Sequence, residues 1–524
     1  MKRCICIFIL IILVPFAVFA QRADNYKPDN KNVRLTSTNL PIVFIETDGQ
    51  TIQRYDRITA RMTVVDNGEG QLNYADTLAH PDQTINYRGY ISLRFRGNST
   101  FNTEKKSYSI RTLTQPLEEG GEKQKVALMG MPKDSKWELL ASMFDKSMMR
   151  NLLAFDLARP WMEFTPHGRF CEMVLDGTYY GVFILFESVS KGKHRLNLST
   201  PGESEEGITG DYLIEVDRPE DHYFRSKYRP VSAAGKAYTN RSISVQYKEP
   251  EYDELTADQR TYIQQSFNEM ETALNAISAS GENTAYREHI DVQSFIDFQL
   301  AHELAHNVDG YRLSCKIYKR NENRGGRFHL VLWDFDLTYG NADYYNGWRT
   351  NTWVYRNNQQ MYNEGDGNLV PFWWYRLNLD ASYRSELKER WAEYRQTNVS
   401  PELINQMIDS LANLLTEGGA MDRNSKAWPR WGRYVWPNYY VAPDFEHEIS
   451  WLKDWIKKRI DWMDTQLDYT DPSLYITDDE THDNERQVVG YYTLDGRPTQ
   501  LSGDGFYIVR FSDGTARKIF YRIH

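Results

Sequence analysis

The chain has 524 residues, of which 41% are hydrophobic and 26% are charged. This balance is ordinary for folded proteins and excludes a chain that is disordered throughout. The formal net charge is −10, and no basic stripe interleaved with aromatic residues is present, so nucleic acid is not an expected partner. At the usual domain size of about 100–200 residues, the length accommodates two or three domains.

The N-terminus has the three parts of a secretory signal peptide. Lys2 and Arg3 give a positive start, residues 5–14 are apolar, and Val18–Ala20 is a small-residue cleavage site. The apolar stretch ends too early to span a membrane, and no later segment has about 18 consecutive apolar residues. We therefore predict that residues 1–20 are a signal peptide and that the protein is exported to the periplasm, cell surface or medium. No membrane-spanning segment is expected after cleavage, and an uncleaved anchor is the alternative.

Cysteine usage excludes two classes of protein. Cys4 and Cys6 belong to the predicted signal peptide, which leaves Cys171 and Cys315. Two cysteines are too few for a disulfide-dense scaffold or a cysteine zinc cluster. A single bridge between them stays open, because their spacing does not decide it.

The first half of the chain is predicted to be rich in strands. Apolar runs and period-two alternation favour strands over residues 40–46, 91–96, 170–175, 179–187 and 211–217. Asp176-Gly177 is a typical turn and indicates a β-hairpin. Residues 145–157 are predicted to form a helix.

From about residue 251 the pattern turns helical. Helices are predicted over residues 291–306, 382–395, 401–417 and 445–467. A strand pair, 313–318 and 328–333, brackets a turn at Asn321–Gly326. Strands first and helices later predict an α+β protein, β-rich in its N-terminal part and helical in its C-terminal part.

A short β-rich tail, residues 488–524, follows an acidic linker at 469–487. The segments Leu494–Arg497 and Gly505–Val509 resemble the C-terminal sorting domain that Bacteroidetes-type bacteria attach to cargo of the type 9 secretion system. The resemblance implies the secretion machinery as a partner. A small β adhesion module is the alternative.

The predicted helix 291–306 ends in an HExxH motif. His302 and His306 lie on one helical face and suit zinc, with Glu303 as general base. A catalytic zinc needs a third protein ligand. The following residues do not continue as in metzincins, and the downstream Glu322 lies in a loop-like segment. A zinc metallopeptidase is therefore an alternative function.

A second arrangement favours phosphoryl transfer. Asn307-Val-Asp309-Gly is followed about 25 positions later by Trp333-Asp334-Phe-Asp336, with a hairpin between. Phosphoryl transfer needs one acid to accept the proton of the attacking hydroxyl and another to hold the metal. Protein kinases place their catalytic loop and magnesium loop in this order.

A candidate phosphate cradle lies upstream. Arg96-Gly-Asn-Ser99-Thr is a turn rich in small residues, in which backbone N–H groups can approach phosphates. Lys105 and Lys106 follow, and a lysine near such a turn can neutralise phosphate charge. An ordinary hairpin turn is the alternative.

Together these motifs resemble the spore coat protein H (CotH) kinase family over residues 38–468. The motifs, in chain order, are Arg96–Thr100 with Lys105–Tyr108, Trp137–Leu140 with Asp145–Asn151, Gly177–Glu187, Asn307–Asp309 and Trp333–Asp336. The resemblance implies an atypical protein-kinase-like fold of two lobes that binds ATP and Mg²⁺ or Mn²⁺. It also implies phosphorylation of Ser or Thr in secreted proteins.

The resemblance also implies residue roles. Asp309 becomes the catalytic-loop acid, Asp334 the metal ligand and Asp336 a second metal ligand. On the nucleotide side the implied residues are Lys105 or Lys106 at the phosphates, Arg96 and Ser99 in the loop above them, and Glu187 at the nucleotide cleft. Asp145 and Arg150 match a family motif expected to brace the site.

Two positions depart from the expected pattern. Kinases place an asparagine five residues after the catalytic aspartate, whereas this chain has Ser314, a poorer metal ligand. Glu104 stands before the lysine pair, where the family often has proline. ATP is also scarce outside the cytoplasm. A non-catalytic surface, scaffold or ligand-binding protein on the same fold is therefore the first alternative to a kinase.

Overall fold

The structure is a computed structural model that describes residues 28–280, 283–470, 488–494, 496–502, 505–512 and 514–521. The predicted signal peptide lies outside the described residues, as does most of the predicted acidic linker. Among the described residues, no helix is both long enough and apolar enough to cross a membrane.

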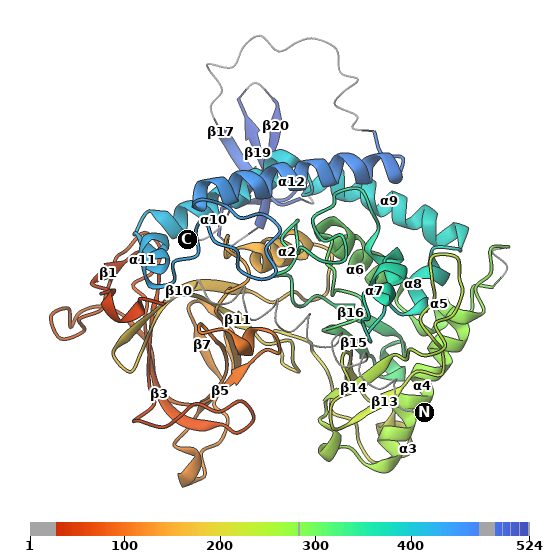
Figure 1. The fold of residues 1–524 in the computed structure, drawn as a ribbon, viewed down its shortest axis with the longest axis horizontal. Coiled ribbons are helices and arrows are strands. Elements are labelled where there is room, and N and C mark those ends of the chain that lie inside the picture. The colour runs from red at the N-terminus through yellow and green to blue at the C-terminus, as the bar shows by residue number, and fades with distance from the viewer. Residues whose placement is uncertain are drawn as a thin grey trace, which may run out of the picture.

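The N-terminal part closes into a β-barrel (Figure 1). Its strands are β2 (Ile42–Glu46), β3 (Ile58–Val65), β5 (Ile85–Arg96), β6 (Ser107–Leu113), β9 (Lys136–Leu140), β10 (Gly168–Leu175) and β11 (Thr178–Glu187). The order around the barrel is β10-β11-β9-β6-β5-β3-β2, and a parallel pairing of β10 with β2 closes it. Alternate side chains of each strand fill the interior, where Leu93, Ile110 and Trp137 are completely buried.

Two predictions for this part can be compared directly with the structure. The hairpin around Asp176-Gly177 is confirmed, since β10 and β11 pair antiparallel and both turn residues have positive φ. The helix predicted over 145–157 begins later, because α2 spans Arg150–Ala158. Asp145 instead accepts hydrogen bonds from the backbone N–H groups of Ser147 and Arg150, and Met148 has a φ of 64°. Side-chain bonds to nearby N–H groups thus replace the first helical turn.

A five-stranded sheet follows, in the order β13-β14-β12-β15-β16. Its strands are β12 (Tyr212–Val216), β13 (Tyr223–Arg225), β14 (Ser244–Glu249), β15 (Cys315–Lys319) and β16 (Phe328–Val331). The late strand pair predicted from the sequence is therefore not a separate insertion. It joins the earlier strands through β12, where Val216 pairs with Cys315.

Helices make up most of the C-terminal part. They are α3 (Glu205–Ile208), α4 (Ala257–Asn275), α5 (Tyr286–His289), α6 (Val292–Ala305), α7 (Asn358–Asn363), α8 (Phe372–Leu377), α9 (Ala381–Thr397), α10 (Pro401–Thr416), α11 (Ala420–Ala427) and α12 (Phe445–Gln466). Short 3₁₀ helices cover Asn30–Asn32, Thr100–Asn102, Leu117–Glu119, Tyr252–Glu254, Glu322–Arg324 and Val354–Arg356. The four predicted helices correspond to α6, α9, α10 and α12. Asp291 caps α6 by accepting from the Ser294 N–H at 2.8 Å, and His306 ends it at a φ of 48°.

One large buried cluster joins these elements. It contains residues of α2, α6, α9, α10 and α12 together with the outer faces of β10 and β11. In Figure 1, α12 lies across the top of the body, below the tail sheet and above α2 and α6. The barrel and the five-stranded sheet lie below on opposite sides. This α+β arrangement has its sheet-rich part first and its helices later, as predicted.

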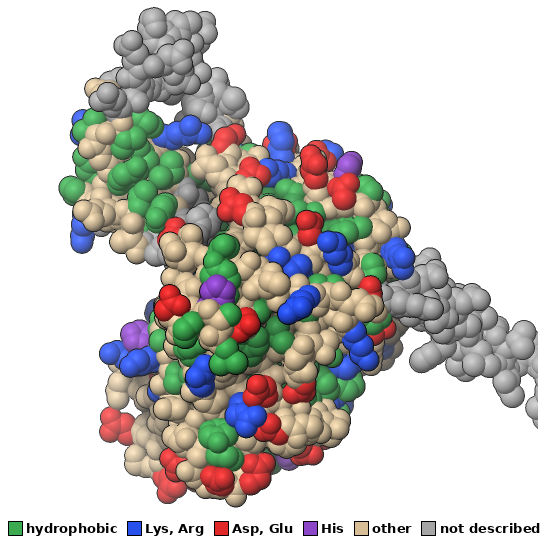
Figure 2. Space-filling view, turned by 90° about the vertical axis from the view of Figure 1, so that its left-hand side faces the viewer, with side chains coloured by type: hydrophobic (Ala, Val, Ile, Leu, Met, Phe, Trp, Pro, Cys, Tyr) green, Lys and Arg blue, Asp and Glu red, His purple; other side chains and the backbone are tan. Residues whose placement is uncertain are grey.

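The tail forms a small sheet in the order β18-β17-β19-β20. Its strands are β17 (Val488–Tyr492), β18 (Pro498–Thr499), β19 (Gly505–Phe511) and β20 (Ala516–Tyr521). Two further strand pairs flank the barrel: β1 (Ser37–Thr38) with β4 (Asn73–Tyr74), and β7 (Val126–Leu128) with β8 (Met131–Asp134). Figure 2 shows the tail sheet projecting from the body with hydrophobic side chains on its surface, while both signs of charge are interspersed over the body.

Candidate active site

The connection from α6 to β15, residues 307–314, forms the centre of the candidate site. Asn307 ties it to the segment after β16, because its Nδ2 donates to the Asp334 backbone carbonyl at 2.9 Å. The Oδ1 of the same side chain accepts from the Asp309 backbone N–H at 3.1 Å. One amide therefore holds the two predicted acidic segments against each other.

Asp309 is fixed on one side by an arginine. Arg312 Nη2 donates to Asp309 Oδ1 at 2.6 Å, and Arg312 Nη1 donates to Asp366 Oδ2 at 2.6 Å. Burial alone would lower the pKa of Arg312, but the two carboxylates raise that pKa above its ordinary value. The Asp309 side chain keeps 21% of its surface exposed. A carboxylate that is oriented by one oxygen and still accessible can accept a proton from a bound hydroxyl.

Asp334 and Asp336 lie in the loop after β16. Asp334 has a φ of 67°, in a region that residues other than glycine rarely adopt. Asn151 Oδ1 holds this turn by accepting from the Phe335 N–H at 2.8 Å. Ser314 Oγ donates to Asp334 Oδ2 at 3.2 Å. Ser314, which stands where kinases have an asparagine, therefore contacts the predicted metal ligand Asp334.

The two aspartates carry an excess of negative charge. Asp334 is solvent-accessible, yet it is recessed among protein atoms, and burial is the largest cause of its raised pKa. Arg96 lowers that pKa and Asp309 raises it. The pKa of Asp336 lies well above its usual range, because of burial and then of the charges of Asp334, Asp145 and Asp309. A divalent cation would relieve this repulsion.

The donor set fits Mg²⁺ or Mn²⁺ that is bound partly by substrate phosphates and water, and it does not fit a metal whose ligands all come from the protein. Among the described residues, no three His, Cys, Asp or Glu side chains are grouped so as to hold a metal ion. Asp334 and Asp336, two positions apart in the loop after β16, supply two carboxylates, and the charge of Asp334 raises the pKa of Asp336. Mg²⁺ in phosphoryl-transfer sites is bound by one or two carboxylates, with substrate phosphates and water completing its shell.

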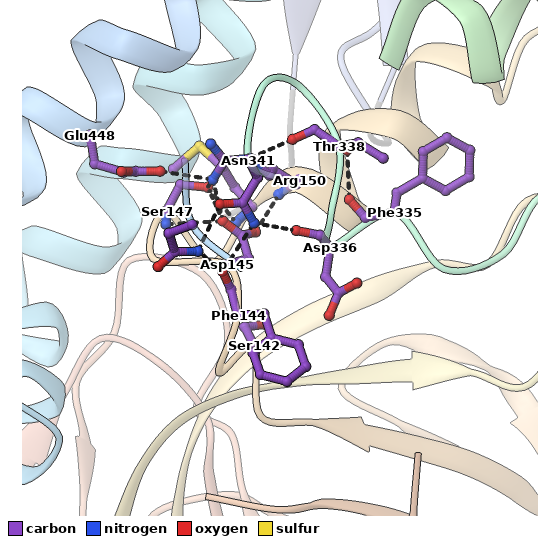
Figure 3. Close-up of polar contacts among 12 residues, drawn as sticks. Ser142, Phe144, Asp145, Ser147, Arg150, Phe335, Asp336, Thr338, Asn341 and Glu448 are labelled. Carbon is purple, nitrogen blue, oxygen red and sulfur yellow. Dashed lines mark hydrogen bonds and ion pairs between the residues drawn. The ribbon is translucent and has the colours of Figure 1, made fainter. Parts of the chain in front are cut away.

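A buried ionic cluster braces the loop that carries Asp336. Arg150 Nη1 donates to Asp145 Oδ1 at 2.5 Å and to Glu448 Oε1 at 2.9 Å. Its Nε donates to the Thr338 carbonyl at 2.9 Å. Figure 3 shows these side chains converging from α2, α12 and the loop, while the Asp336 carboxylate points away from them. The predicted brace residues Asp145 and Arg150 are thus joined by Glu448, which no sequence pattern had indicated.

The predicted nucleotide-side residues are more widely distributed. Arg96 lies at the end of β5, close enough to Asp334 to lower its pKa. Ser99 is exposed in the hairpin between β5 and β6. Glu187 ends β11 fully buried, and its Oε2 accepts from the His167 backbone N–H at 3.0 Å.

The two predicted lysines bind backbone carbonyls. Lys105 is completely buried, and its Nζ donates to the carbonyls of Ala141 and Val182 and to Asn424 Oδ1. Burial lowers its pKa well below the usual range. Lys106 Nζ donates to the carbonyls of Phe101 and Thr103 and so closes its own hairpin. These placements do not fit the predicted phosphate contact of either lysine.

The HExxH residues are engaged in packing and support. His302 packs against Phe298 and Phe335, with ring centroids 4.1 and 4.7 Å apart. The Glu303 carboxylate accepts from Tyr311 Oη, from Arg459 and from the N–H groups that open the 3₁₀ helix Val354–Arg356. A carboxylate with so many donors is not a free general base. The motif therefore anchors the end of α6, and its geometry does not favour the zinc peptidase alternative.

Cys171 and Cys315 are both buried and free. They lie in β10 and β15, which belong to different sheets. The single disulfide left open by the sequence is therefore absent from this structure.

Several residues of the site were not indicated individually by the sequence. Arg312, Asp366 and Glu448 come from separate segments, and no spacing rule links them. Glu138, which pairs with Arg96, lay inside the recognised Trp137–Leu140 motif. That motif was the one signal that pointed to it.

Comparison with known proteins identifies the family of this chain. A family model described as CotH kinase protein matches residues 93–463, which is more than half of the 524-residue chain. Inner spore coat protein H of Bacillus subtilis (strain 168) is 23% identical over 253 residues. That alignment spans 48% of this chain and 59% of the relative. The chain therefore belongs to the CotH kinase protein family.

Proposed function

We propose that this protein is a kinase-like phosphotransferase that moves the γ-phosphoryl group of ATP to Ser or Thr hydroxyls of exported proteins. The observation that supports it best is the meeting of Asp309, Ser314 and Asp334 in one site. Two hydrogen bonds of Asn307 join their segments, and Ser314 donates to Asp334. Family membership supports a kinase-like protein, and this acidic centre supplies the groups that phosphoryl transfer requires.

Each acid has a distinct role in this proposal. Asp334 and Asp336 would hold Mg²⁺ or Mn²⁺, and the ion would neutralise charge on the nucleotide phosphates. Asp309 takes the proton of the acceptor hydroxyl while that oxygen bonds to the γ-phosphorus. The bond from the γ-phosphorus to the bridging oxygen breaks, and ADP leaves with that oxygen. The barrel then corresponds to one lobe of a kinase-like body, and the five-stranded sheet with its helices to the other.

Export completes the proposal. The predicted signal peptide would take the chain across the inner membrane, and the tail sheet would act as a sorting domain for the type 9 secretion machinery. The substrate would then be a protein that shares this route. Nucleotide must reach the enzyme outside the cytoplasm, or phosphorylation must precede export.

Ser314 favours a second candidate, a non-catalytic protein that binds nucleotide or another ligand. Its hydroxyl donates to Asp334 instead of offering an amide oxygen to a second metal. A site with one well-held cation can bind nucleotide and transfer phosphate slowly or not at all.

Radiolabelled ATP separates the two candidates. With Mg²⁺ or Mn²⁺, the purified protein should transfer label to its own hydroxyls or to dephosphorylated casein. Asp309→Ala should lower this rate about 100- to 10,000-fold, the range for losing a general base, while ATP binding persists. Asp334→Ala should abolish transfer and weaken metal-dependent ATP binding.

Asp461→Ala is the control and should retain the wild-type rate, since its carboxylate pairs with Lys457 on the exposed surface of α12. Nucleotide binding without transfer would favour the second candidate. A wild-type protein that binds no nucleotide would overturn the phosphotransferase and leave a non-catalytic protein that binds another ligand.

A further inference from the structure

We propose that the ion pair of Arg96 and Glu138 anchors the nucleotide phosphates, in place of Lys105 or Lys106. This inference rests on the proposed phosphotransferase function. It assigns the phosphate-binding cation to the end of β5 and its positioning acid to β9.

Strand register brings the pair together on the outer face of the barrel. Arg96 pairs with Ser107 across β5 and β6, and Ser109 pairs with Glu138 across β6 and β9. Directly opposed residues share a face, so both charged side chains project outward over β6. The two serines between them are small and leave room for contact. Arg96 Nε lies 3.3 Å from Glu138 Oε2 as a result.

The Arg96 guanidinium lies over the ring of Trp333, the residue that precedes Asp334. The distance from the guanidinium carbon to the centroid of the Trp333 ring is 5.0 Å. The guanidinium charge also lowers the pKa of Asp334. A cation in this position is near the metal-binding carboxylates, where the phosphate chain of a metal-bound nucleotide has to run.

One nitrogen of this guanidinium lacks a hydrogen-bond partner among the described residues. The Nη1 atom is buried and has no hydrogen-bond partner among the described residues, while the whole side chain keeps 25% of its surface exposed. Glu138 holds only the Nε edge. A buried donor without a partner is costly, and a phosphate oxygen would supply the missing acceptor to a guanidinium already paired at Nε.

Glu138 is itself fixed. Its Oε1 accepts from Ser188 Oγ at 2.6 Å, and Ser188 directly follows β11. The side chain is 14% exposed, so the pair is largely shielded from solvent. Glu138 therefore acts as a positioning residue that sets the direction of the Arg96 fork.

The lysines are unsuited to the same task. The Lys105 ammonium has three oxygen partners inside the protein, and the Lys106 ammonium has two in its own hairpin. Moving either to a phosphate would leave those carbonyls without their donors, at a cost for each buried group. In protein kinases a strand lysine pairs with a helix glutamate. Here both members of the pair come from barrel strands, and the cation is an arginine.

Calorimetric titration of the full chain with MgADP and with adenosine tests the assignment. Arg96→Ala should weaken MgADP binding about 10- to 100-fold, the range expected for charged hydrogen bonds, and should leave adenosine binding within twofold. Arg96→Lys should give an intermediate loss, because the charge remains and the fork is lost. Glu138→Ala should weaken MgADP binding severalfold, with partial rescue in Glu138→Gln, which keeps an acceptor for Arg96.

Arg111→Ala is the matched control. Arg111 lies in β6, the strand next to β5, and its guanidinium is 3.8 Å from the carboxylate of Glu251. The variant should bind MgADP like the wild type. If Arg96→Ala unfolds, Arg96→Lys decides instead. If the Arg96 variants bind MgADP as tightly as the wild type, this inference is overturned while the proposed function stands. A tenfold loss of affinity confined to Lys106→Ala would have the same consequence. A wild type that binds neither ligand would instead overturn the proposed function.

Discussion

His302 shows what burial does to a titratable side chain that has no charged partner. Both ring nitrogens are buried without a hydrogen-bond partner among the described residues, and the ring packs between aromatic side chains. Burial lowers its pKa to about 3. The side chain therefore stays neutral in the folded protein and acts as an aromatic packing group against Phe298 and Phe335.

This burial makes stability depend on pH in a defined direction. The unfolded His302 takes up a proton near pH 6.5, whereas the folded side chain does so only near pH 3. Its contribution is therefore present above pH 6.5 and is lost as the pH falls toward 3. The expected slope is about 1.4 kcal/mol of unfolding free energy per pH unit for this one histidine.

Urea unfolding of wild type and His302→Leu between pH 8 and pH 4.5 measures the effect. The difference between the two proteins should be constant above pH 6.5 and should shift in favour of the variant below it. The values at pH 8, where histidine is neutral in both states, serve as the internal control. Parallel curves over the whole range would show that folded His302 takes up protons as readily as the unfolded side chain.

At the scale of elements, the start of α2 is set by ions instead of by helix propensity. Asp145, Arg150 and Glu448 are almost completely buried, with side-chain exposures of 1%, 1% and 3%. Their contacts join α2, α12 and the loop of Asp336 through the Thr338 carbonyl. Removing one member of a buried ionic cluster is costly, because the remaining charges lose their partner.

Arg150→Ala should therefore lower the free energy of unfolding by about 3–5 kcal/mol, since it leaves two buried carboxylates unpaired. Lys457→Ala is the matched control, because Lys457 and Asp461 form an exposed pair within α12. That variant should change stability by less than about 0.5 kcal/mol. Chemical denaturation of both variants measures this. Equal stabilities of the two would contradict a structural role for the cluster.

The sequence predicted those elements that depend on residues close together in the chain. The period of α6, α9, α10 and α12 and the Asp176-Gly177 turn depend on residues close in sequence, and all appear in the structure. The parallel closure of β10 on β2 joins residues far apart, so no local pattern could indicate the barrel. The same limit explains why Glu448 was missed as a partner of Arg150.

The candidate site was predicted in part for a similar reason. Asp309 and Asp334 lie in short motifs, and the structure brings these motifs together through Asn307. The lysine roles depended on side-chain direction, which spacing does not fix. The Lys105 side chain enters the protein interior, where its ammonium group donates to Asn424 of α11 instead of facing the site.

At the scale of the whole molecule, the tail sheet contacts the body through described residues of β19 and β20. Phe506 packs into the main buried cluster, and Lys518 Nζ donates to the Gln396 carbonyl at 2.6 Å. A groove between the tail sheet and the body is lined by residues of α9, α10 and β20, including Arg395, Leu403 and Arg517. If the tail acts as the proposed sorting domain, the body has to fold without it.

A chain ending at residue 470 should therefore fold and keep the nucleotide affinity of the full chain. Its body loses the contact of Phe506, and burying one such side chain contributes about 1.5–3 kcal/mol. For a protein of this size that is a fall of a few degrees at most in the melting temperature. Phe506→Ala in the full chain should reproduce most of the same fall, because it removes the same contact. Scanning calorimetry of the three proteins checks this, and a truncated chain that aggregates or melts more than about 10 °C lower would show that the tail is part of the structural core.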